Sequence, residues 1–284
     1  MTDDPTAPTH WTQFDRLYDL PDPRPYFRGI ATGDYRMPEV LAGMVAQILP
    51  LVSERSGGSV RIVDFACGYG AVGMCLRYGL SMTEIYRYFA QPGDVARDAA
   101  YLRNIRRAGL VPHRIDGIDI AENALAYAER VGAVDMGHAQ NILTGTIPDN
   151  LAADIAHAGL ILESGAIGDL IAPAMESLLT LARHGSTPWV LICPRPRVDL
   201  RPLMAALDGL DYDMHTILPR IRYRKPFSAE EREEEIRMGI ANGLSADDCM
   251  VDDYFRVDMR LLAPKGEHVD AVLAEAARFA ETGV

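Results

Sequence analysis

Two acidic residues and a glycine-rich turn have the types and spacing that suit ligand binding. Asp64 lies in the apolar run VRIVDFA, and Gly68 and Gly70 follow it in the stretch CGYG. Asp119 lies at the end of a second apolar stretch, RIDGIDI. Glycines let a ligand approach the backbone closely. An acid after the second strand can accept hydrogen bonds from both hydroxyls of a ribose. These residues predict a nucleoside site.

Two kinds of nucleoside fit such a site, and they differ in charge. A dinucleotide places its pyrophosphate on a helix N-terminus, where an acid would repel it. S-adenosylmethionine carries an ammonium and a sulfonium instead, so an acid such as Asp64 suits it. The stretch GYGAVG satisfies G-x-G-x-x-G, but a lone match is weak. The order of acid and glycines, with the elements downstream, favours S-adenosylmethionine.

Alternating strands and helices must hold these residues in place. Strands are expected over 60–66 and within 113–120, 137–142, 153–165, 187–194, 211–224 and 253–264. Helices are expected over 36–55, 121–132, 169–185 and 228–243. Such alternation indicates a parallel α/β sheet, and the last two strands indicate a terminal antiparallel hairpin.

The interval between the first two strands is unusually long. A strand–helix–strand unit takes about 30 residues, whereas 73–89 and 93–109 both have helical patterns before the next strand begins. We therefore expect extra helices inserted at about 77–111. Residues 1–35 form a proline-containing lead-in, and 36–284 are assigned to a single ligand-binding domain.

The composition narrows the class of protein. The chain has 284 residues, a formal net charge of −12 and a pI of about 5.0, so an acidic surface disfavours nucleic acid as a partner. The four cysteines have no CxxC spacing and the histidines no metal-ligand spacing, so no metal site is expected. No signal peptide or membrane-length apolar run is recognised, and a cytoplasmic protein is expected.

Five stretches resemble the successive motifs of a known family. VDFACGYG, GIDIAENALAYAERVG, GHAQNI, GLILESGAIG and WVLICPRP look like those of class I S-adenosylmethionine-dependent methyltransferases, and the resemblance covers about residues 36–264. It implies a Rossmann-like fold with a mostly parallel seven-stranded sheet, a reversed seventh strand and S-adenosyl-L-methionine as cofactor. Cys67 departs from the family pattern, which usually has a smaller residue there, and the inserted helices could cap a substrate pocket.

The resemblance also implies a role for individual residues. Asp64 and the backbone at Ala66, Gly68 and Gly70 would hold the methionine part, Asp119 the ribose, and Ile120 the adenine. Gln140 and Asn141 would lie near the adenine amino group, Glu163 and Ser164 near the methionine end and the acceptor, and Tyr26 over the cofactor.

Several of these residues have a second interpretation. Asp64 with its glycines could form a simple turn, Asp119 a helix N-cap, and Gln140 with Asn141 a surface turn. Glu163 could be a general base or the partner of an arginine. The aromatic residues of the lead-in could cover the cofactor or anchor a loose segment by burial; these are Tyr26, Phe27 and Tyr35. Three alternate arginines could protect a solvated edge strand or form a carboxylate-binding patch; these are Arg220, Arg222 and Arg224.

The leading functional prediction is methyl transfer to a small molecule, in secondary metabolism. A sulfonium methyl is already activated, so the protein mainly aligns the reactants. A base is needed only if the acceptor must lose a proton, and Glu163 and Tyr35 are the catalytic candidates. One alternative is a cyclase resembling azetidine-2-carboxylate synthase, in which the amine of S-adenosylmethionine attacks its own side chain and methylthioadenosine leaves. Others are a non-catalytic S-adenosylmethionine-binding protein and, less favoured, an NAD-linked oxidoreductase. A homodimer is left open.

Overall fold

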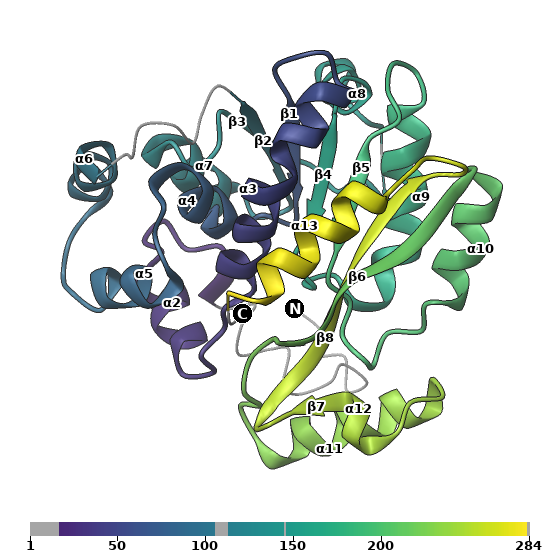
Figure 1. Cartoon of the computed structure of the whole chain (residues 1–284). Helices are drawn as coiled ribbons and strands as arrows, with labels where there is room; N and C mark the ends of the chain where they lie inside the picture. Colours follow the sequence, from purple (N-terminus) through teal and green to yellow (C-terminus); the bar gives the residue numbers. More distant parts are fainter. Residues whose placement is uncertain (1–16, 106–112, 145, 283–284) are drawn as a thin grey trace.

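One sheet runs through the structure, a computed structural model that describes residues 17–105, 113–144 and 146–282. Its continuous strand order is β3-β2-β1-β4-β5-β8-β6 (Figure 1). These strands are β1 (Arg61–Phe65), β2 (Arg114–Asp119), β3 (Met136–Ala139), β4 (Leu160–Glu163), β5 (Trp189–Ile192), β6 (Tyr212–Arg222) and β8 (Tyr254–Pro264). The short strand β7 (Met250–Val251) pairs with β8 outside this order.

The direction of the strands confirms the expected sheet. β1 pairs in parallel with β2 and β4, and the pairs β2–β3 and β4–β5 are parallel as well. β8 runs antiparallel to both β5 and β6. The fold is therefore a mostly parallel, Rossmann-like α/β sheet with a terminal antiparallel hairpin, as predicted. β7 is an addition to the seven strands that the sequence led us to expect.

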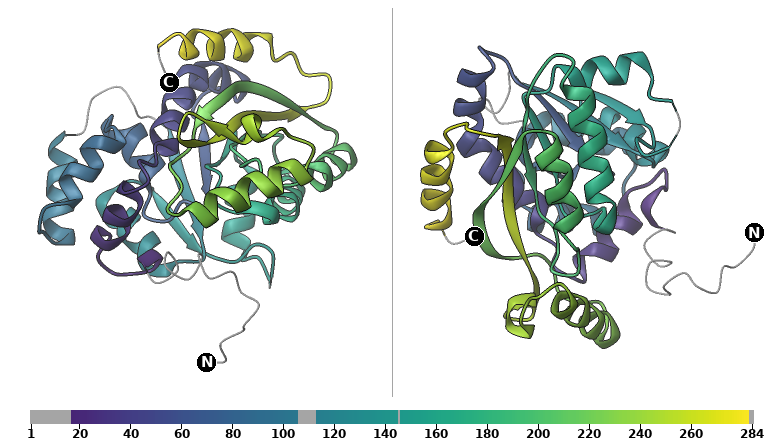
Figure 2. Two further views of the ribbon diagram at one scale, coloured as in Figure 1. Left: turned by 90° about the horizontal axis from the view of Figure 1, so that it is seen from below. Right: turned by 90° about the vertical axis from the view of Figure 1, so that its right-hand side faces the viewer.

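Helices cover both faces of the sheet (Figure 2). One face carries α3 (Met37–Arg55), α4 (Ala71–Tyr78), α7 (Glu122–Val131) and α13 (Asp270–Ala280). The other carries α8 (Asp149–Ala156), α9 (Ile171–Ala182) and α10 (Arg201–Gly209). Successive strand residues point to opposite faces, so Ile62 joins the first apolar cluster and Val63 the second. Burial on both faces explains the unbroken apolar run of β1.

Between β1 and β2, the described residues form three helices. Residues 73–89 divide into α4 and α5 (Met82–Phe89), because Gly79 adopts a left-handed φ of 63° that ends α4 and Ser81 begins α5 with a capping box. α6 (Val95–Ile105) follows, and the rest of the predicted helix lies outside the described residues. α8, α10, α12 (Ala246–Cys249), α13 and β7 were not predicted.

The lead-in is fixed to these inserted helices by a buried ion pair. Arg24 of α2 (Arg24–Ala31) donates to the two carboxylate oxygens of Asp98 on α6 at 2.6 and 3.1 Å. Tyr88 and Tyr127 donate to the same carboxylate at 2.8 and 3.1 Å. The ring of Phe27 stacks on Phe89 at 4.4 Å. α2 is therefore held against the inserted helices by both polar and aromatic contacts.

None of the helices in the described ranges is long and apolar enough to cross a membrane.

Candidate active site

A cavity of about 810 Å³ opens beyond the carboxyl ends of the parallel strands. Its walls come from the loops after β1, β2, β3, β4 and β5, with α2 on one side and the start of α11 (Ala229–Ala241) on another. Figure 2, seen from below, shows α11 and α2 at this end of the sheet. Ligands of open α/β sheets bind in such crevices, and the volume lies in the range of small-molecule sites.

The structure brings most of the predicted site residues to this cavity. It is lined by Tyr26, Tyr35, Ala66, Asp119, Ile120, Gln140, Asn141 and Ser164. Asp64, Gly68, Gly70 and Glu163 do not line it. The side chains of Asp64 and Glu163 are buried in β1 and at the end of β4, and the two glycines belong to the turn after β1. Only the first group is therefore placed to contact a ligand directly.

The glycine turn after β1 is tightly built. Ala66, Gly68 and Gly70 have φ values of 57°, 50° and 74°, a region in which a residue with a Cβ is strained. A Cβ on Gly70 would lie 2.8 Å from the Cβ of Ala133, so no side chain fits there. The amides of Ala66 and Cys67 donate to the carbonyl of Ile118 at 2.8 and 3.3 Å. The turn is therefore fastened to β2, beside Asp119.

Asp119 sits where the first two strands meet the cavity. Its Oδ2 accepts from the amide of Gly68 at 2.8 Å and from the hydroxyl of Tyr18 at 3.0 Å, and its Oδ1 accepts from the amide of Ala121 at 3.0 Å. The amides of Asn123 and Ala124 in the first turn of α7 donate instead to Asp19 of the lead-in, at 2.7 and 3.3 Å. Asp119 is thus not needed to cap that turn.

The lead-in passes over the glycine turn. The hydroxyl of Tyr69 accepts from the amide of Leu20 at 2.9 Å and donates to its carbonyl at 2.8 Å. A Cβ on Gly68 would lie 2.8 Å from the hydroxyl of Tyr18. Phe27 is fully buried as an anchor, while Tyr26 and Tyr35 face the cavity. Phe27 is therefore an anchor, whereas a role of Tyr26 and Tyr35 in covering a cofactor stays a prediction.

An apolar shelf lies on the far side of Asp119. The side chain of Ile120 is 71% exposed although it is apolar, and it forms part of the cavity wall with Ile142 and Leu143. Asn141 accepts from the amide of Leu143 at 2.9 Å, and the amide group of Gln140 donates to the carbonyl of Asn141 at 3.3 Å. The apolar side chains suit the face of a flat ring, and the side chains of Gln140 and Asn141 suit a polar edge of that ring.

Asp64 is buried at the end of β1 without a hydrogen bond to its side chain among the described residues, and its Oδ2 is fully enclosed. Burial, together with the charges of Asp119 and Glu163, raises the pKa of this carboxyl from 3.8 to about 8. At about pH 7 the group is therefore mostly protonated. A cation arriving nearby would favour its ionised form.

We expect D64N to become more stable relative to the unchanged chain as pH rises. The native carboxyl binds its proton up to about pH 8, whereas the unfolded one releases it near 3.8, so its contribution to folding is lost across this interval. The amide does not titrate. Thermal melting should show the difference in Tm, variant minus unchanged chain, growing by about 2 °C or more between about pH 5 and about pH 8. A difference independent of pH would contradict the raised pKa.

Glu163 and Ser164 close the floor of the cavity at the end of β4. The carboxylate of Glu163 is fully buried, and its Oε1 accepts from the amides of Gly165 and Ala166 at 2.8 and 2.6 Å. Burial raises its pKa, and these amide hydrogen bonds oppose the rise. The hydroxyls of Tyr35 and Tyr223 donate to the carbonyls of Ser164 and Gly165 at 3.2 and 3.0 Å. Glu163 therefore shapes this turn from behind the wall, and only Ser164 reaches the cavity.

The sequence interpretation missed several residues of the wall. Arg195 and Arg197 follow β5 in the stretch PRPR. Tyr223, Phe227 and the first turn of α11 line the same part of the cavity, away from Asp119. Two arginines directly after a buried parallel strand were a usable indication, because that position is at the ligand-binding edge. Across 17–105, 113–144 and 146–282, no cluster of three metal-ligating side chains occurs.

The mostly parallel sheet, its reversed strand β8 and the cavity at the tips of β1, β2 and β4 agree with the fold that the resemblance to class I S-adenosylmethionine-dependent methyltransferases implied.

Comparison with known proteins gives only distant likenesses. No protein-family model matches the chain, and no curated protein matches it significantly. A methyltransferase structure from Archaeoglobus fulgidus is 13% identical, covering 80% of this chain and 94% of its own, with a TM-score of 0.40. The plantazolicin methyltransferase, solved with S-adenosylhomocysteine, is 14% identical, covering 91% and 92%, with a TM-score of 0.38. Magnesium protoporphyrin IX methyltransferase from Synechocystis, solved with S-adenosylmethionine, is 8% identical, covering 78% and 77%, with a TM-score of 0.36.

Proposed function

We propose that the chain binds S-adenosylmethionine and transfers its methyl group to a small molecule. The observation that carries this proposal is a continuous cavity of about 810 Å³, which reaches from Asp119 past Ser164 to Arg195. A nucleoside on the Asp119 side leaves the part beyond β4 and β5 for a second molecule. The two would meet near the floor at Ser164.

The cavity wall offers a matching contact for each part of the cofactor. Asp119 would accept hydrogen bonds from the ribose hydroxyls, in place of the hydroxyl of Tyr18. The adenine would lie on Ile120, with Gln140 and Asn141 at its polar edge. The methionine part would extend along Ala66 toward Ser164 and Tyr26. The ring of Tyr26 is placed to contribute a cation–π interaction of about 0.5–2 kcal/mol with the sulfonium.

Asp64 would respond to the positive charge of the cofactor from behind the glycine turn. Its carboxyl is mostly protonated at about pH 7, because its pKa is raised to about 8. The ammonium and sulfonium would lower that pKa and draw the group into its ionised form. Binding would then release a proton from the protein at neutral pH, and D64N would lack this release.

The reaction itself requires alignment more than acid–base chemistry. When bound, the cofactor supplies an activated methyl group. The protein holds the acceptor in line with it, which provides much of the rate. Burial raises the pKa of Tyr35 well above its ordinary value, so its hydroxyl stays protonated and supports the floor through Ser164. Tyr35 is therefore proposed as a positioning residue, and Glu163 as a support for the turn after β4.

We further propose that residues 1–35 act as a cover over the cofactor, separate from the domain at 36–284. The described part of this lead-in places Tyr18 on Asp119, Asp19 on the start of α7 and Tyr26 in the cavity wall. A ligand entering beside Asp119 must replace the contact with Tyr18.

Y18F is therefore expected to bind S-adenosylhomocysteine up to about fivefold more tightly than the unchanged chain. The ribose would no longer compete with the Tyr18 hydroxyl for Asp119, and a net hydrogen bond is worth about 0.5–1.5 kcal/mol. Isothermal titration calorimetry measures the affinity, and Y254F, whose hydroxyl bonds to the distant Asp34, serves as the control. Weaker binding by Y18F would show that Tyr18 contacts the ligand instead of competing with it.

The proposed activity is tested by its by-product. The purified protein is incubated with S-adenosylmethionine, with and without cell extract, and the adenosyl product is identified by mass spectrometry. Formation of S-adenosylhomocysteine only with extract supports transfer to a small acceptor. Methylthioadenosine formed without extract would contradict it and indicate the cyclase instead. Binding without either product, even with extract, would indicate a non-catalytic S-adenosylmethionine-binding protein.

A further inference from the structure

The part of the cavity beyond β5 has a distinct chemistry. Its wall combines three arginines with aromatic and apolar side chains: Arg195, Arg197, Arg224, Tyr35, Tyr223, Phe227, Ile167 and Leu170. The arginines come from the loop after β5 and from the chain between β6 and α11. They lie on the half of the sheet away from Asp119, because β4 and β5 lie on the opposite side of β1 from β2.

Arg195 is a buried cation with unused hydrogen-bonding capacity. Its side chain is only 8% exposed, and it makes no hydrogen bond with the described residues. It lies over the rings of Tyr223 and Phe255, at 5.8 and 5.6 Å from their centres, which fix its orientation. Its acidic neighbours are Glu235, whose Oε2 lies 3.4 Å from its Nη1, and Glu231, whose Oε1 lies 3.9 Å away, both beyond good hydrogen-bond geometry. A guanidinium has five N–H donors, and leaving them unpaired in a buried place is costly.

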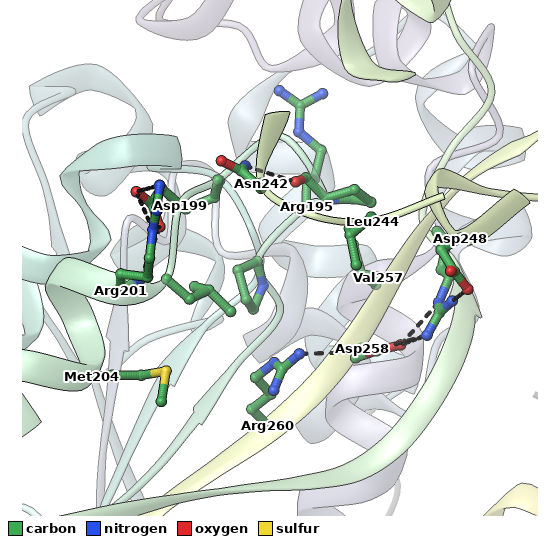
Figure 3. Close-up of a pocket in the computed structure, with 15 residues that line it drawn as sticks. Arg195, Asp199, Arg201, Met204, Asn242, Leu244, Asp248, Val257, Asp258 and Arg260 are labelled. Atoms are coloured by element: carbon green, nitrogen blue, oxygen red, sulfur yellow. Dashed lines mark hydrogen bonds and ion pairs between the residues drawn. The ribbon is translucent and has the colours of Figure 1, made fainter. Parts of the chain in front are cut away.

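Arg195 lines two cavities, and its guanidinium faces away from the smaller of them. A second, smaller pocket of about 250 Å³ lies on its other side, between α10 and β8. Figure 3 shows the guanidinium of Arg195 pointing away from that small pocket. Charged residues that line the small pocket pair with one another, as in Asp199–Arg201 and Asp248–Arg256. The small pocket therefore does not use the charge of Arg195.

The neighbouring charges leave one guanidinium without a counterion. Arg224 is held by Glu231, from its Nη1 to Oε2 at 3.0 Å and by a second bond from Nη2. Glu235 lies beside Arg195 and accepts the backbone amide of Arg197 at 3.3 Å. The side chain of Arg197 lines the cavity and makes no hydrogen bond or ion pair within the described parts of the chain. Glu230 at the rim is exposed, where water and salt screen its charge.

We propose that Arg195 and Arg197 bind a carboxylate of the small molecule that occupies the cavity beside the cofactor. The planar fork of a guanidinium matches a carboxylate and can bind it through two parallel hydrogen bonds. The surrounding Tyr35, Tyr223 and Phe227 suit an apolar or aromatic body attached to that carboxylate. This proposal rests on the proposed function, since it names the acceptor as a carboxylic acid with an apolar body.

A second source of the same chemistry is the amino-acid end of the cofactor, which also carries a carboxylate. The acceptor is favoured because Arg195 and Arg197 follow β5, whereas the residues suited to the nucleoside follow β1, β2 and β3. β4, with Ser164, lies between the two groups. The two sources are separated by the experiment below.

The first arm of the experiment measures preference for a carboxylate. The protein, saturated with S-adenosylhomocysteine, is titrated with phenylacetate and with its neutral analogue phenylacetamide, followed by ligand-observed NMR. The unchanged chain is expected to bind the carboxylate about tenfold or more tightly than the amide. R197Q should lose most of that preference without loss of fold, because the side chain of Arg197 has no partner among the described residues. R201Q, which changes an exposed arginine outside the cavity, should keep the preference.

The second arm identifies the source of the carboxylate. The affinities of R197Q for S-adenosylhomocysteine and for methylthioadenosine, which lacks the amino-acid part, are compared with those of the unchanged chain. Equal affinities, with loss of the phenylacetate preference, support the acceptor. A selective loss of about tenfold for S-adenosylhomocysteine would assign both arginines to the cofactor and overturn the proposal. Absence of a carboxylate preference in the unchanged chain, or its survival in R197Q, would overturn it as well. Failure of the unchanged chain to bind S-adenosylhomocysteine would instead contradict the proposed function.

Discussion

D119A is expected to bind S-adenosylhomocysteine about 100-fold more weakly than the unchanged chain. A carboxylate that accepts both ribose hydroxyls makes two charge-assisted hydrogen bonds, each worth about 1.5–3 kcal/mol. Asp119 is the acid that the structure places at the tip of β2, facing the cavity and bonded to the amide of Gly68. Its removal also leaves the amide of Gly68 without its acceptor, so the glycine turn loses one of the hydrogen bonds that hold it in place.

The controls separate binding from folding. D119N keeps the size of the side chain and should retain part of the affinity, because its amide oxygen still accepts one hydrogen bond. D199A removes an exposed carboxylate that pairs with Arg201 outside the cavity, and it should bind like the unchanged chain. Calorimetry gives each affinity, and circular dichroism checks that each variant is folded. An unchanged affinity in a folded D119A would remove Asp119 from the nucleoside site.

D98A is expected to lose about 3–5 kcal/mol of stability, the largest effect on folding among these predictions. Asp98 is fully buried and accepts hydrogen bonds from Arg24, Tyr88 and Tyr127. Its removal would leave the guanidinium of Arg24, only 5% exposed, without its fully buried partner and paired with Asp22, whose side chain is 53% exposed. The contact between α2 and the inserted helices would weaken, and with it the wall that Tyr26 forms.

A double variant tests whether the loss comes from the buried charge of Arg24 once Asp98 is removed. R24M/D98L replaces the ion pair with apolar side chains of similar size, which is often nearly neutral for a buried pair. Urea unfolding should show D98A well below the unchanged chain, with R24M/D98L recovering much of the difference. If the double variant were as unstable as D98A, the hydrogen bonds of Tyr88 and Tyr127 would be the dominant contribution instead.

Local patterns predicted the central sheet and the nucleoside half of the site. The strands at Asp64 and Asp119 could be located because an apolar run followed by a turn is a local feature of the sequence. The resemblance to the methyltransferase motifs then placed Ile120, Asn141 and Ser164 at the carboxyl edge, where the structure has them. Their proposed roles in binding stay predictions.

The remaining features depend on contacts between distant parts of the chain. Arg24 and Asp98 are 74 positions apart, and nothing in their local sequence pairs them. Tyr18 reaches Asp119 across 101 positions. From the sequence, Arg220, Arg222 and Arg224 are interpreted as protecting an edge strand or, alternatively, as a carboxylate-binding patch. Arg222, on the edge strand β6, pairs with Asp252, and Arg224 pairs with Glu231. Among the described arginines of the cavity wall, Arg197 has no ion pair within 4.0 Å, which only the folded arrangement of β5 and α11 reveals.

The most direct measurement is a crystal structure of the protein with S-adenosylhomocysteine. The account predicts both ribose hydroxyls within about 3 Å of the carboxylate of Asp119, the adenine over Ile120, and the Tyr18 hydroxyl displaced from Asp119. The sulfur should face the part of the cavity that Ser164 shares with Arg195 and Arg197. A nucleoside bound elsewhere, or a site in which Tyr18 still holds Asp119 at saturating ligand, would contradict the account.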